Sequence, residues 1–427
     1  MIQPGWPAPA AIGAVHATVA VPGSKSMTNR ALLCAALADG RSRVRRPLVS
    51  RDSALMTAGL GAFGARFEPI GRDLLVTGVP PPFRLGSAPL HVEVGLSGTV
   101  TRFLPPVAAL SGTSIGFDGD EHMRSRPIGR LLTALRELGA EIDDDGRGAL
   151  PFVVNGRGRV AGGSVTVDAS QSSQLVSGLL LAAPYFDAGV DVHLAGDLPS
   201  APHVAMTVAM MRRAGADVDA APARWRVLPG AYESRDVEIE PDATSASYFF
   251  AAAAITGGTV TVPDWPHDSV QPSDHVLGVL TAMGVRFEYA DGALTAIGPG
   301  TLTGIDVDMH DISEVTPTVA VLAAVAAGPT RIRGVGHIRL HETDRLAALA
   351  AEINRLGGDV NETDDGLEIR PRPLTGGRWE TYADHRLAMS GAVLGLVVPG
   401  IEIVDIGCTS KTMPDFAERW LAMAAGG

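Results

Sequence analysis

The segment Leu138-Gly139-Ala140-Glu141 ends an amphipathic stretch and begins an alternating one, and four similar segments occur elsewhere in the chain. They are Phe63-Gly64-Ala65-Arg66, Ala214-Gly215-Ala216-Asp217, Met283-Gly284-Val285-Arg286 and Leu356-Gly357-Gly358-Asp359. A glycine at this position is typical of a helix end that turns through a left-handed residue. The residues after each glycine alternate, pass a polar turn and alternate again, which predicts hairpins over 67–78, 141–155, 217–228, 286–297 and 359–369.

A second series of segments, offset from the first, predicts buried helices. Small or polar residues precede alanine-rich apolar stretches near Ser24, Ser97, Ser170, Thr244, Ser313 and Asp384. Helices that are apolar on all sides are typical of a protein interior. Each repeat therefore contains a buried helix, a strand, an amphipathic helix and a hairpin, and there are six repeats. The sixth lacks its hairpin, and we expect the N-terminal strand, residues 14–21, to substitute for it.

Six repeats of roughly 70 residues exceed one hydrophobic core, so the repeats predict an α/β protein with two domains of three repeats each. The expected crossings contain proline and lie at Val21-Pro22-Gly23 and Glu240-Pro241-Asp242. One domain would then hold residues 1–22 and 243–427, and the other residues 23–242. A stacked solenoid is the alternative arrangement of such repeats.

Composition narrows the class of protein. The 427 residues carry a net charge of −12, which argues against nucleic acid and anionic membrane as partners. The chain has two cysteines, too few for a disulfide scaffold or a cysteine-based zinc site, and its histidines show no metal spacing. It has no apolar run of about 18 residues and no secretory signal, so we expect a cytoplasmic protein.

Several cations lie where the pattern places helix starts. They are Lys25, Arg30, Arg126, Arg386 and Lys411. A helix N-terminus is already positive, so a cation there is unfavourable unless an anion binds beside it. We infer a site for a ligand with several negative groups.

Each of these motifs also has an ordinary structural interpretation. Gly23-Ser24-Lys25-Ser26 lacks the spacing of a nucleotide P-loop, and Ser172-Ser173-Gln174 on its own is typical of a helix cap. Arg345 could simply pair with Glu342 three residues before it. The recurrence of cations at one repeat period favours the functional interpretation.

Together these motifs resemble the 5-enolpyruvylshikimate-3-phosphate synthase family over almost the whole chain. The matching segments, in order, are Pro22–Ser26 with Asn29-Arg30, Gly98-Thr99, Arg126-Pro127-Ile128, Ser172-Ser173-Gln174, Glu342–Arg345, Asp384-His385-Arg386 and Lys411. The resemblance implies two domains of three βαββαβ units, with the active site in the cleft between the domains. It implies the small-molecule substrates phosphoenolpyruvate and shikimate-3-phosphate, no cofactor, no metal and a monomer.

The resemblance also implies roles for individual residues. Phosphoenolpyruvate would be held by Lys25, Gly98, Arg126, Gln174, Arg345, Arg386 and Lys411. Shikimate-3-phosphate would be held by Lys25, Ser26, Arg30, Ser172, Ser173, Gln174, Ser200, Glu314 and His341. The implied catalytic residues are Lys25, Glu314 as the base and Glu342 as the acid that protonates the methylene carbon.

Four positions depart from the family pattern. His203, His337 and His341 stand where many members have Tyr, Asn and Lys, and Glu314 stands where many have Asp. Gly98 matches the glycine of members that are sensitive to glyphosate, which implies sensitivity here.

Two alternatives to this function remain. One is the sister enolpyruvyl transferase that acts on a UDP-amino sugar and is usually marked by a reactive loop cysteine. The other is a non-catalytic repeat protein that binds anions.

Overall fold

The computed structural model describes residues 5–83, 85, 86, 88 and 90–426. The chain divides into two compact units, which we call the terminal unit (Met1–Pro22 with Glu240–Gly427) and the inserted unit (Gly23–Ile239). The second boundary precedes Glu240, whereas the sequence placed it after Asp242. Over the described residues, no helix combines the length and apolar character needed to cross a membrane.

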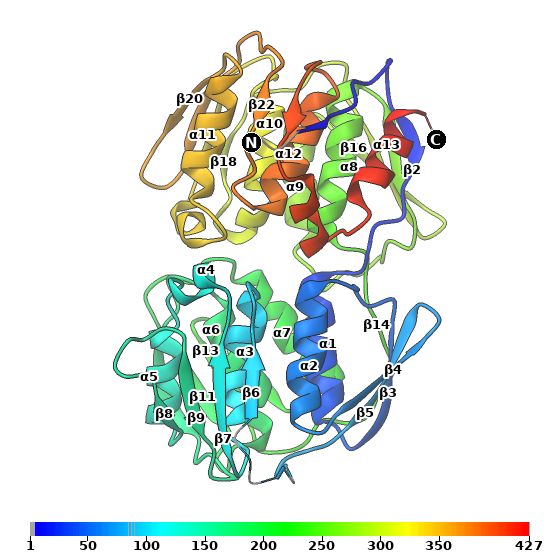
Figure 1. The fold of residues 1–427 in the computed structure, drawn as a ribbon. Helices are drawn as coiled ribbons and strands as arrows, with labels where there is room; N and C mark the ends of the chain where they lie inside the picture. The colour runs from blue at the N-terminus through cyan, green and yellow to red at the C-terminus, as the bar shows by residue number, and fades with distance from the viewer. Residues whose placement is uncertain (1–4, 84, 87, 89, 427) are drawn as a thin grey trace. The chain divides into compact units, whose positions relative to one another are not determined.

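Over the described residues, the strands form six small sheets, three in each unit (Figure 1). The first two strands of each sheet in the inserted unit run parallel, as β10 and β11 do, and the predicted hairpin adds two antiparallel strands. The chain therefore forms compact domains, and the solenoid alternative is wrong.

The inserted unit contains the sheets β14-β3-β5-β4, β6-β7-β9-β8 and β10-β11-β13-β12. Its strands are β3 (Gly40–Arg45), β4 (Arg66–Ile70), β5 (Asp73–Gly78), β6 (Leu90–Glu93), β7 (Ser114–Asp118), β8 (Glu141–Asp143), β9 (Phe152–Asn155), β10 (Gly163–Asp168), β11 (Val190–Ala195), β12 (Val218–Ala221), β13 (Arg224–Val227) and β14 (Val237–Glu238). Its helices are α1 (Lys25–Leu37), α2 (Arg51–Ala62), α3 (Gly98–Ala108), α4 (Glu121–Arg124), α5 (Gly129–Glu137), α6 (Gln174–Ala182), a 3₁₀ helix (Ala183–Tyr185) and α7 (Pro202–Arg213).

The terminal unit contains the sheets β16-β17-β15-β2, β18-β19-β21-β20 and β1-β23-β22. Its strands are β1 (Trp6–Pro7), β2 (His16–Thr18), β15 (Thr259–Val262), β16 (Arg286–Ala290), β17 (Ala293–Ile297), β18 (Asp306–Asp308), β19 (Thr330–Arg333), β20 (Asp359–Glu362), β21 (Leu367–Arg370), β22 (Arg378–Trp379) and β23 (Glu402–Ile403). Its α-helices are α8 (Ala243–Thr256), α9 (Ser273–Ala282), α10 (Thr316–Ala323), α11 (Arg345–Arg355), α12 (His385–Gly395) and α13 (Phe416–Ala424). Its 3₁₀ helices are His310–Val315, Gly336–Leu340 and Ile406–Lys411.

The five repeated glycines all adopt a positive φ, between 94° and 107°, directly after an amphipathic helix. Each is followed by one of the five predicted hairpins, and all five hairpins pair antiparallel. The glycine repeat therefore predicted both the end of the helix and the strands that follow it.

The expectation for the N-terminal strand was wrong. Strand β2 pairs parallel with β15 in the sheet of the fourth repeat, β16-β17-β15-β2. It does not complete the sheet of the sixth repeat, which instead gains β1 through its pairing with β23. The position beside β15 is open because the strand that ends the third repeat, β14, turns back and pairs with β3. Both ends of the chain thus belong to the terminal unit, where Arg419 of α13 also donates a 2.6 Å hydrogen bond to the Ala20 carbonyl.

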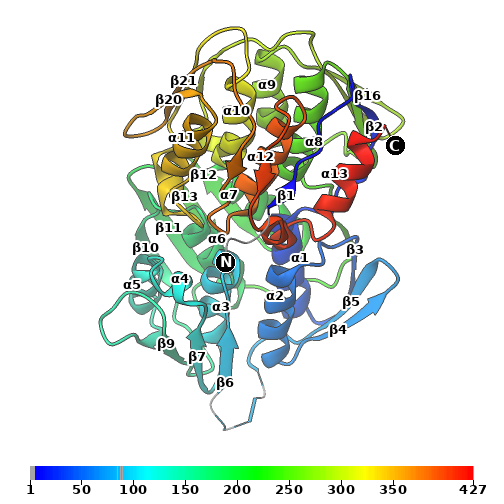
Figure 2. The same cartoon turned by 45° about the horizontal axis from the view of Figure 1, so that its top comes forward.

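The apolar helices form the interior of each unit, as predicted. In the terminal unit α8, α10 and α12 pack against one another (Figure 2), and in the inserted unit α6 packs against α1 and α3. Ser24 and Ser97 cap α1 and α3, each accepting a 3.4 Å hydrogen bond from a backbone N–H. Helix α10 begins later than expected, at Thr316, because a 3₁₀ turn occupies His310–Val315 and Pro317 suits the first helical turn.

Candidate functional site

The predicted site residues fall into two clusters, one in each unit. The cluster of the inserted unit contains Lys25, Ser26, Arg30, Gly98, Arg126, Ser172, Ser173, Gln174 and Ser200. The cluster of the terminal unit contains Glu314, His341, Glu342, Arg345, Arg386 and Lys411.

The expectation that the cations begin helices is only partly right. Lys25 is the first residue of α1, and Arg386 is the second residue of α12. Arg126 lies in the connection between α4 and α5, and Lys411 ends a 3₁₀ helix five residues before α13. For these two the cation is held by a turn, so the argument from the helix dipole does not apply to them.

The start of α3 brings Gly98 against two arginines and a glutamine. An atom added at the Cβ position of Gly98 would lie 2.8 Å from Arg102 Nη1, 3.2 Å from Gln174 Oε1 and 3.6 Å from Arg126 Nη1. Arg102 Nη1 also donates to the Gly98 carbonyl at 3.3 Å and to Gln174 Oε1 at 3.4 Å. Arg126 has no carboxylate partner among the described residues. This part of the cluster therefore offers guanidinium groups for an anion.

Lys25 lies beside a buried carboxylate that the sequence did not reveal. Its Nζ is 3.8 Å from Asp52 Oδ2, and the side chain of Asp52 is only 4% exposed. Asp52 is in the first turn of α2, where the sequence suggests only a helix start. The pair holds the ammonium group of Lys25 near the N-terminus of α1.

Arg30 of α1 contacts three other helices of the inserted unit, α3, α6 and α7. Its guanidinium donates to Thr207 Oγ1 of α7 at 2.6 Å, to Ser177 Oγ of α6 at 3.3 Å and to the Ser26 carbonyl at 2.9 Å. It also lies 5.1 Å from the ring centroid of Phe103 on α3. Burial lowers the pKa of Arg30 to about 9, so the group remains charged at neutral pH. Its position among four helices makes it a structural centre of the cluster.

Three serines of this cluster, Ser172, Ser173 and Ser200, lie just before the starts of α6 and α7. Ser172 Oγ accepts a hydrogen bond from the backbone N–H of Gln174, 3.3 Å away, and Ser173 is buried beside it. Ser200 has a φ of 55°, an unusual conformation for a residue with a side chain, just before α7. Such conformations are often kept where a loop must present a group to a ligand.

In the terminal unit a carboxylate is held between two cations. Glu342 accepts from Arg345 Nη2 at 2.7 Å and from Lys411 Nζ at 2.5 Å. Arg345 is 1% exposed and also donates to Asp384, whose side chain is fully buried, at 2.7 Å. Burial alone would lower the pKa of Arg345, but Asp384 and Glu342 outweigh it and raise that pKa above its ordinary value. Arg345 is therefore a permanent cation that fixes Glu342 in place.

A buried tyrosine lies beside the arginines of this cluster. Tyr248 of α8 lies beside Arg386, Arg345 and Asp384, and burial raises the pKa of its phenol. Asp384 caps α12 by accepting from the backbone N–H of Arg386 at 2.9 Å. The side chain of Arg386 has no carboxylate partner among the described residues, so this guanidinium, like that of Arg126, is suited to an external anion.

Three histidines form a row next to Glu314. The ring centroids of His310 and His337 are 5.9 Å apart, and those of His337 and His341 are 6.0 Å apart. His337 Nε2 bonds Ser313 Oγ at 2.8 Å, and His341 Nδ1 lies 2.9 Å from Arg345 Nη1. Since a guanidinium only donates, His341 accepts through Nδ1 and is neutral in this arrangement. The row therefore places three imidazole groups beside the cations of this cluster.

The acid stability of the protein should depend on His337. Burial lowers its pKa from 6.5 to about 4, with Glu314 opposing the shift and His310 and Arg345 adding to it. Between these pH values the unfolded chain binds the proton and the folded chain does not, so stability falls as pH falls. We expect His337→Asn to reduce the stability lost between pH 7 and pH 5 by about 2 kcal/mol.

Urea unfolding at the two pH values measures this difference. His267→Asn is the matched control, because His267 is 79% exposed and should leave the pH dependence unchanged. Equal losses of stability in wild type and His337→Asn would show that His337 is protonated in the folded protein at pH 5.

Neither cysteine has the features of a reactive thiol. Cys34 is buried in α1, and Cys408 lies in the 3₁₀ helix before α13. Burial raises the pKa of both thiols to about 12, assisted at Cys408 by Asp405. A thiol that stays protonated is a poor nucleophile.

Two residues that contact the predicted site, Arg102 and Asp52, were not predicted from the sequence, for different reasons. Arg102 could have been found, because it lies four residues after Gly98 and so on the same face of α3. The pairing of Lys25 with Asp52 had no signal, since a separation of 27 residues predicts no contact by itself.

Comparison with known proteins gives a consistent result. Residues 9–420 match the family described as EPSP synthase (3-phosphoshikimate 1-carboxyvinyltransferase). The 3-phosphoshikimate 1-carboxyvinyltransferase of Mycobacterium ulcerans (strain Agy99) is 52% identical over 434 residues, covering 100% of this chain and 99% of the relative. Two structures of EPSP synthase from Acinetobacter baumannii match at 25% identity over 98% of this chain, with TM-scores of 0.83 and 0.80, and cover 97% and 96% of those chains. The enolpyruvyl transferase-like fold expected from the sequence is thereby confirmed.

Proposed function

The chain belongs to the EPSP synthase family, and on this premise we propose which of its side chains bind the substrates and which carry the reaction. As a 3-phosphoshikimate 1-carboxyvinyltransferase, it transfers the enolpyruvyl group of phosphoenolpyruvate to the 5-hydroxyl of shikimate-3-phosphate and releases phosphate. The reaction is a step of the shikimate pathway to the aromatic amino acids.

The proposed ligands combine fixed cations with polar groups at helix starts. For phosphoenolpyruvate they are Lys25, Gly98, Arg126, Gln174, Arg345, Arg386 and Lys411. For shikimate-3-phosphate they are Lys25, Ser26, Arg30, Ser172, Ser173, Gln174, Ser200, Glu314 and His341. Both substrates carry a carboxylate and a phosphate, and guanidinium groups pair with such anions through two parallel hydrogen bonds.

The arrangement of Glu342 is the observation that carries the catalytic proposal. A site that only bound anions would gain nothing from a carboxylate among its cations, yet Glu342 is held by Arg345 and Lys411 at 2.7 and 2.5 Å. We assign it the proton that the methylene carbon of phosphoenolpyruvate receives. Glu314 takes the proton of the attacking 5-hydroxyl, and a tetrahedral adduct with a new methyl group forms. Phosphate then leaves, one proton of that methyl group returns to the carboxylate of Glu342, and the enol ether is restored.

The UDP-sugar alternative is not favoured, because the thiols of Cys34 and Cys408 both have pKa values raised to about 12. Phosphate release by the purified protein separates the two reactions. We expect release with phosphoenolpyruvate and shikimate-3-phosphate, and none when a UDP-N-acetylamino sugar replaces shikimate-3-phosphate. Lys411→Ala should remain folded and lose most of this activity. Release with the UDP sugar alone would refute the assignment.

Inhibition by glyphosate should depend on the space beside Gly98. The wild-type enzyme should be sensitive, and Gly98→Ala should raise the inhibition constant by at least about tenfold, more than it raises the KM for phosphoenolpyruvate. The added methyl would displace Arg102 and Gln174, whose atoms lie 2.8 and 3.2 Å from it, and the longer inhibitor has less room to adjust.

Steady-state inhibition at low phosphoenolpyruvate measures both constants. Gly61→Ala is the control, because a methyl at that position of α2 would meet no atom within 4 Å. If both constants of Gly98→Ala rise equally, Gly98 does not distinguish the inhibitor from the substrate.

The proposal includes a monomer that acts in the cytoplasm. Its two cysteines are free, as is usual for proteins of a reducing compartment. Light scattering on the purified enzyme tests the oligomeric state, and a mass of twice 44.2 kDa would contradict it.

A further inference from the structure

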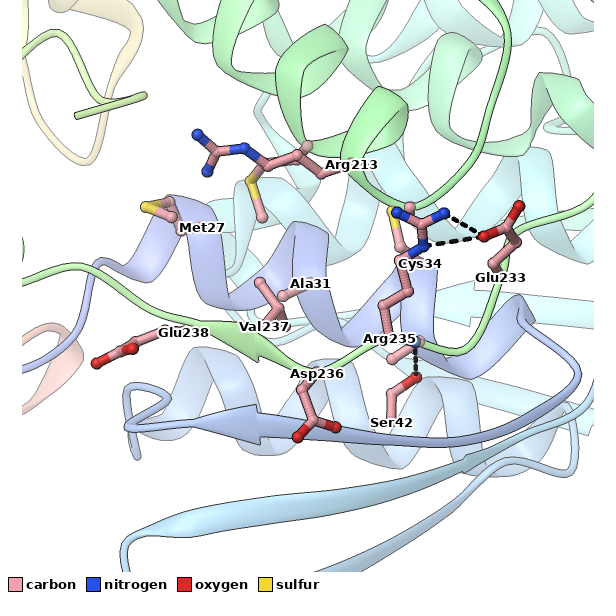
Figure 3. Close-up of a pocket in the computed structure, with 13 residues that line it drawn as sticks. Met27, Ala31, Cys34, Ser42, Arg213, Glu233, Arg235, Asp236, Val237 and Glu238 are labelled. Atoms are coloured by element: carbon pink, nitrogen blue, oxygen red, sulfur yellow. Dashed lines mark hydrogen bonds and ion pairs between the residues drawn. The ribbon is translucent and has the colours of Figure 1, made fainter. Parts of the chain in front are cut away.

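The inserted unit contains a cavity whose lining shares no residue with the two clusters. It has a volume of about 410 Å³ and lies between α1, the end of α7 and residues 233–238 (Figure 3). Volumes of this order are typical of pockets for small molecules. We call it the α1–α7 pocket.

One side of the pocket is apolar. Met27, Ala31, Cys34 and Ala35 line it from α1, where their spacing of four, three and one residues places them on one helical face. Met210 of α7 completes the apolar side. Because three of the four α1 positions carry small side chains, the helix leaves space for an apolar group.

The carboxylates of the pocket are already paired with arginines. Glu233 accepts from Arg235 Nε at 2.9 Å, as Figure 3 shows. Asp236 lies 3.2 Å from Arg45, and Glu238 lies 2.5 Å from Arg46. These ion pairs neutralise the negative charge of the lining.

Arg213 is the second arginine of the lining, and it takes no part in these ion pairs. It comes from the last turn of α7, and its side chain extends along the edge of the pocket on the side of Met27 (Figure 3). Its guanidinium has no hydrogen-bond or ion-pair partner among the described residues. A guanidinium beside an apolar surface is suited to a ligand with one anionic group and a hydrocarbon body.

We propose that the α1–α7 pocket binds a small apolar monocarboxylate, with its carboxylate on Arg213 and its hydrocarbon part against α1. A single negative charge matches the guanidinium of Arg213, which is unpaired among the residues that the structure describes. A second negative charge would find no other unpaired cation in the lining that the structure describes, which disfavours a phosphate dianion. The proposal is independent of the substrate assignments above.

Equilibrium dialysis of the full-length protein with 2-naphthoate tests the proposal. We expect one saturable site, with binding weakened by at least about tenfold in Arg213→Gln and for the neutral analogue 2-naphthylmethanol. Ala214→Leu, which places a larger side chain in the half-buried lining of the pocket, should prevent binding. Arg226→Gln removes the same charge from an exposed position outside the lining and should bind as the wild type does.

A further variant distinguishes the pocket from the substrate site. Arg126→Gln changes a proposed phosphoenolpyruvate ligand and should leave naphthoate binding unchanged. If Arg126→Gln binds naphthoate more weakly and Arg213→Gln binds it as the wild type does, the probe lies at the substrate site and the proposal is overturned. Absence of saturable binding, or equal binding of the neutral analogue, would also overturn it.

Discussion

Replacing Glu342 by glutamine is expected to lower turnover by about 100-fold or more, while the protein still folds and binds both substrates. Glutamine keeps the size and polarity of the side chain but cannot donate the proton that the methylene carbon needs. In the free enzyme, Arg345 and Lys411 stabilise the ionised form of Glu342. The anionic substrates would offset these cations, so we expect proton uptake when the ternary complex forms.

Single-turnover measurements separate the chemical step from binding, and calorimetry in buffers of different ionisation enthalpy counts the protons. Glu362→Gln is the matched control, because Glu362 is an exposed carboxylate of the same unit that pairs with Arg339. If Glu342→Gln forms product at nearly the wild-type rate, Glu342 only fixes Arg345 and Lys411 in place.

Replacing Arg345 by methionine should lower the free energy of unfolding by about 3–5 kcal/mol, the usual cost of breaking a buried ion pair. Arg345 and Asp384 have side chains that are 1% and 0% exposed, and their atoms lie 2.7 Å apart. The substitution leaves a buried carboxylate without its main partner. Activity should also be lost, because the same arginine holds Glu342.

Urea unfolding of two reference variants tests whether the unpaired buried charge causes the loss of stability in Arg345→Met. Arg370→Met removes a surface arginine, 51% exposed, that pairs with Asp359, and should cost less than about 1 kcal/mol. The double variant Arg345→Met with Asp384→Leu should regain part of the loss, since both buried charges are then absent. A double variant that is less stable than Arg345→Met would show that Asp384 stabilises the fold through its other contacts.

The repeat could be predicted from the sequence because its signals are local. A glycine after an amphipathic stretch requires a particular backbone conformation, and alternation within a few residues predicts a strand. The partner of an edge strand is not a local property, which is why β2 was assigned to the wrong sheet.

In the candidate site, too, contacts between residues far apart in the sequence could not be predicted. The cations could be identified one by one, and Arg345 with Glu342 was foreseen as an i,i+3 pair. The contact between Arg345 and Asp384 joins residues 39 apart, and the one between Lys411 and Glu342 joins residues 69 apart. Such contacts arise from the packing of one repeat on the next, so sequence spacing could not predict them.

The strand order sets the sequence of events as the chain leaves the ribosome. The inserted unit receives its last strand, β14, by residue 238, and all of its partners have been made by then. Strands β1 and β2 are synthesised first, but they pair with Glu402–Ile403 and Thr259–Val262, which are made much later. The segment that emerges first must therefore remain unpaired while the inserted unit folds. A nascent chain stalled just after the inserted unit has emerged should carry one protease-resistant unit and an N-terminal extension that proteases still cleave.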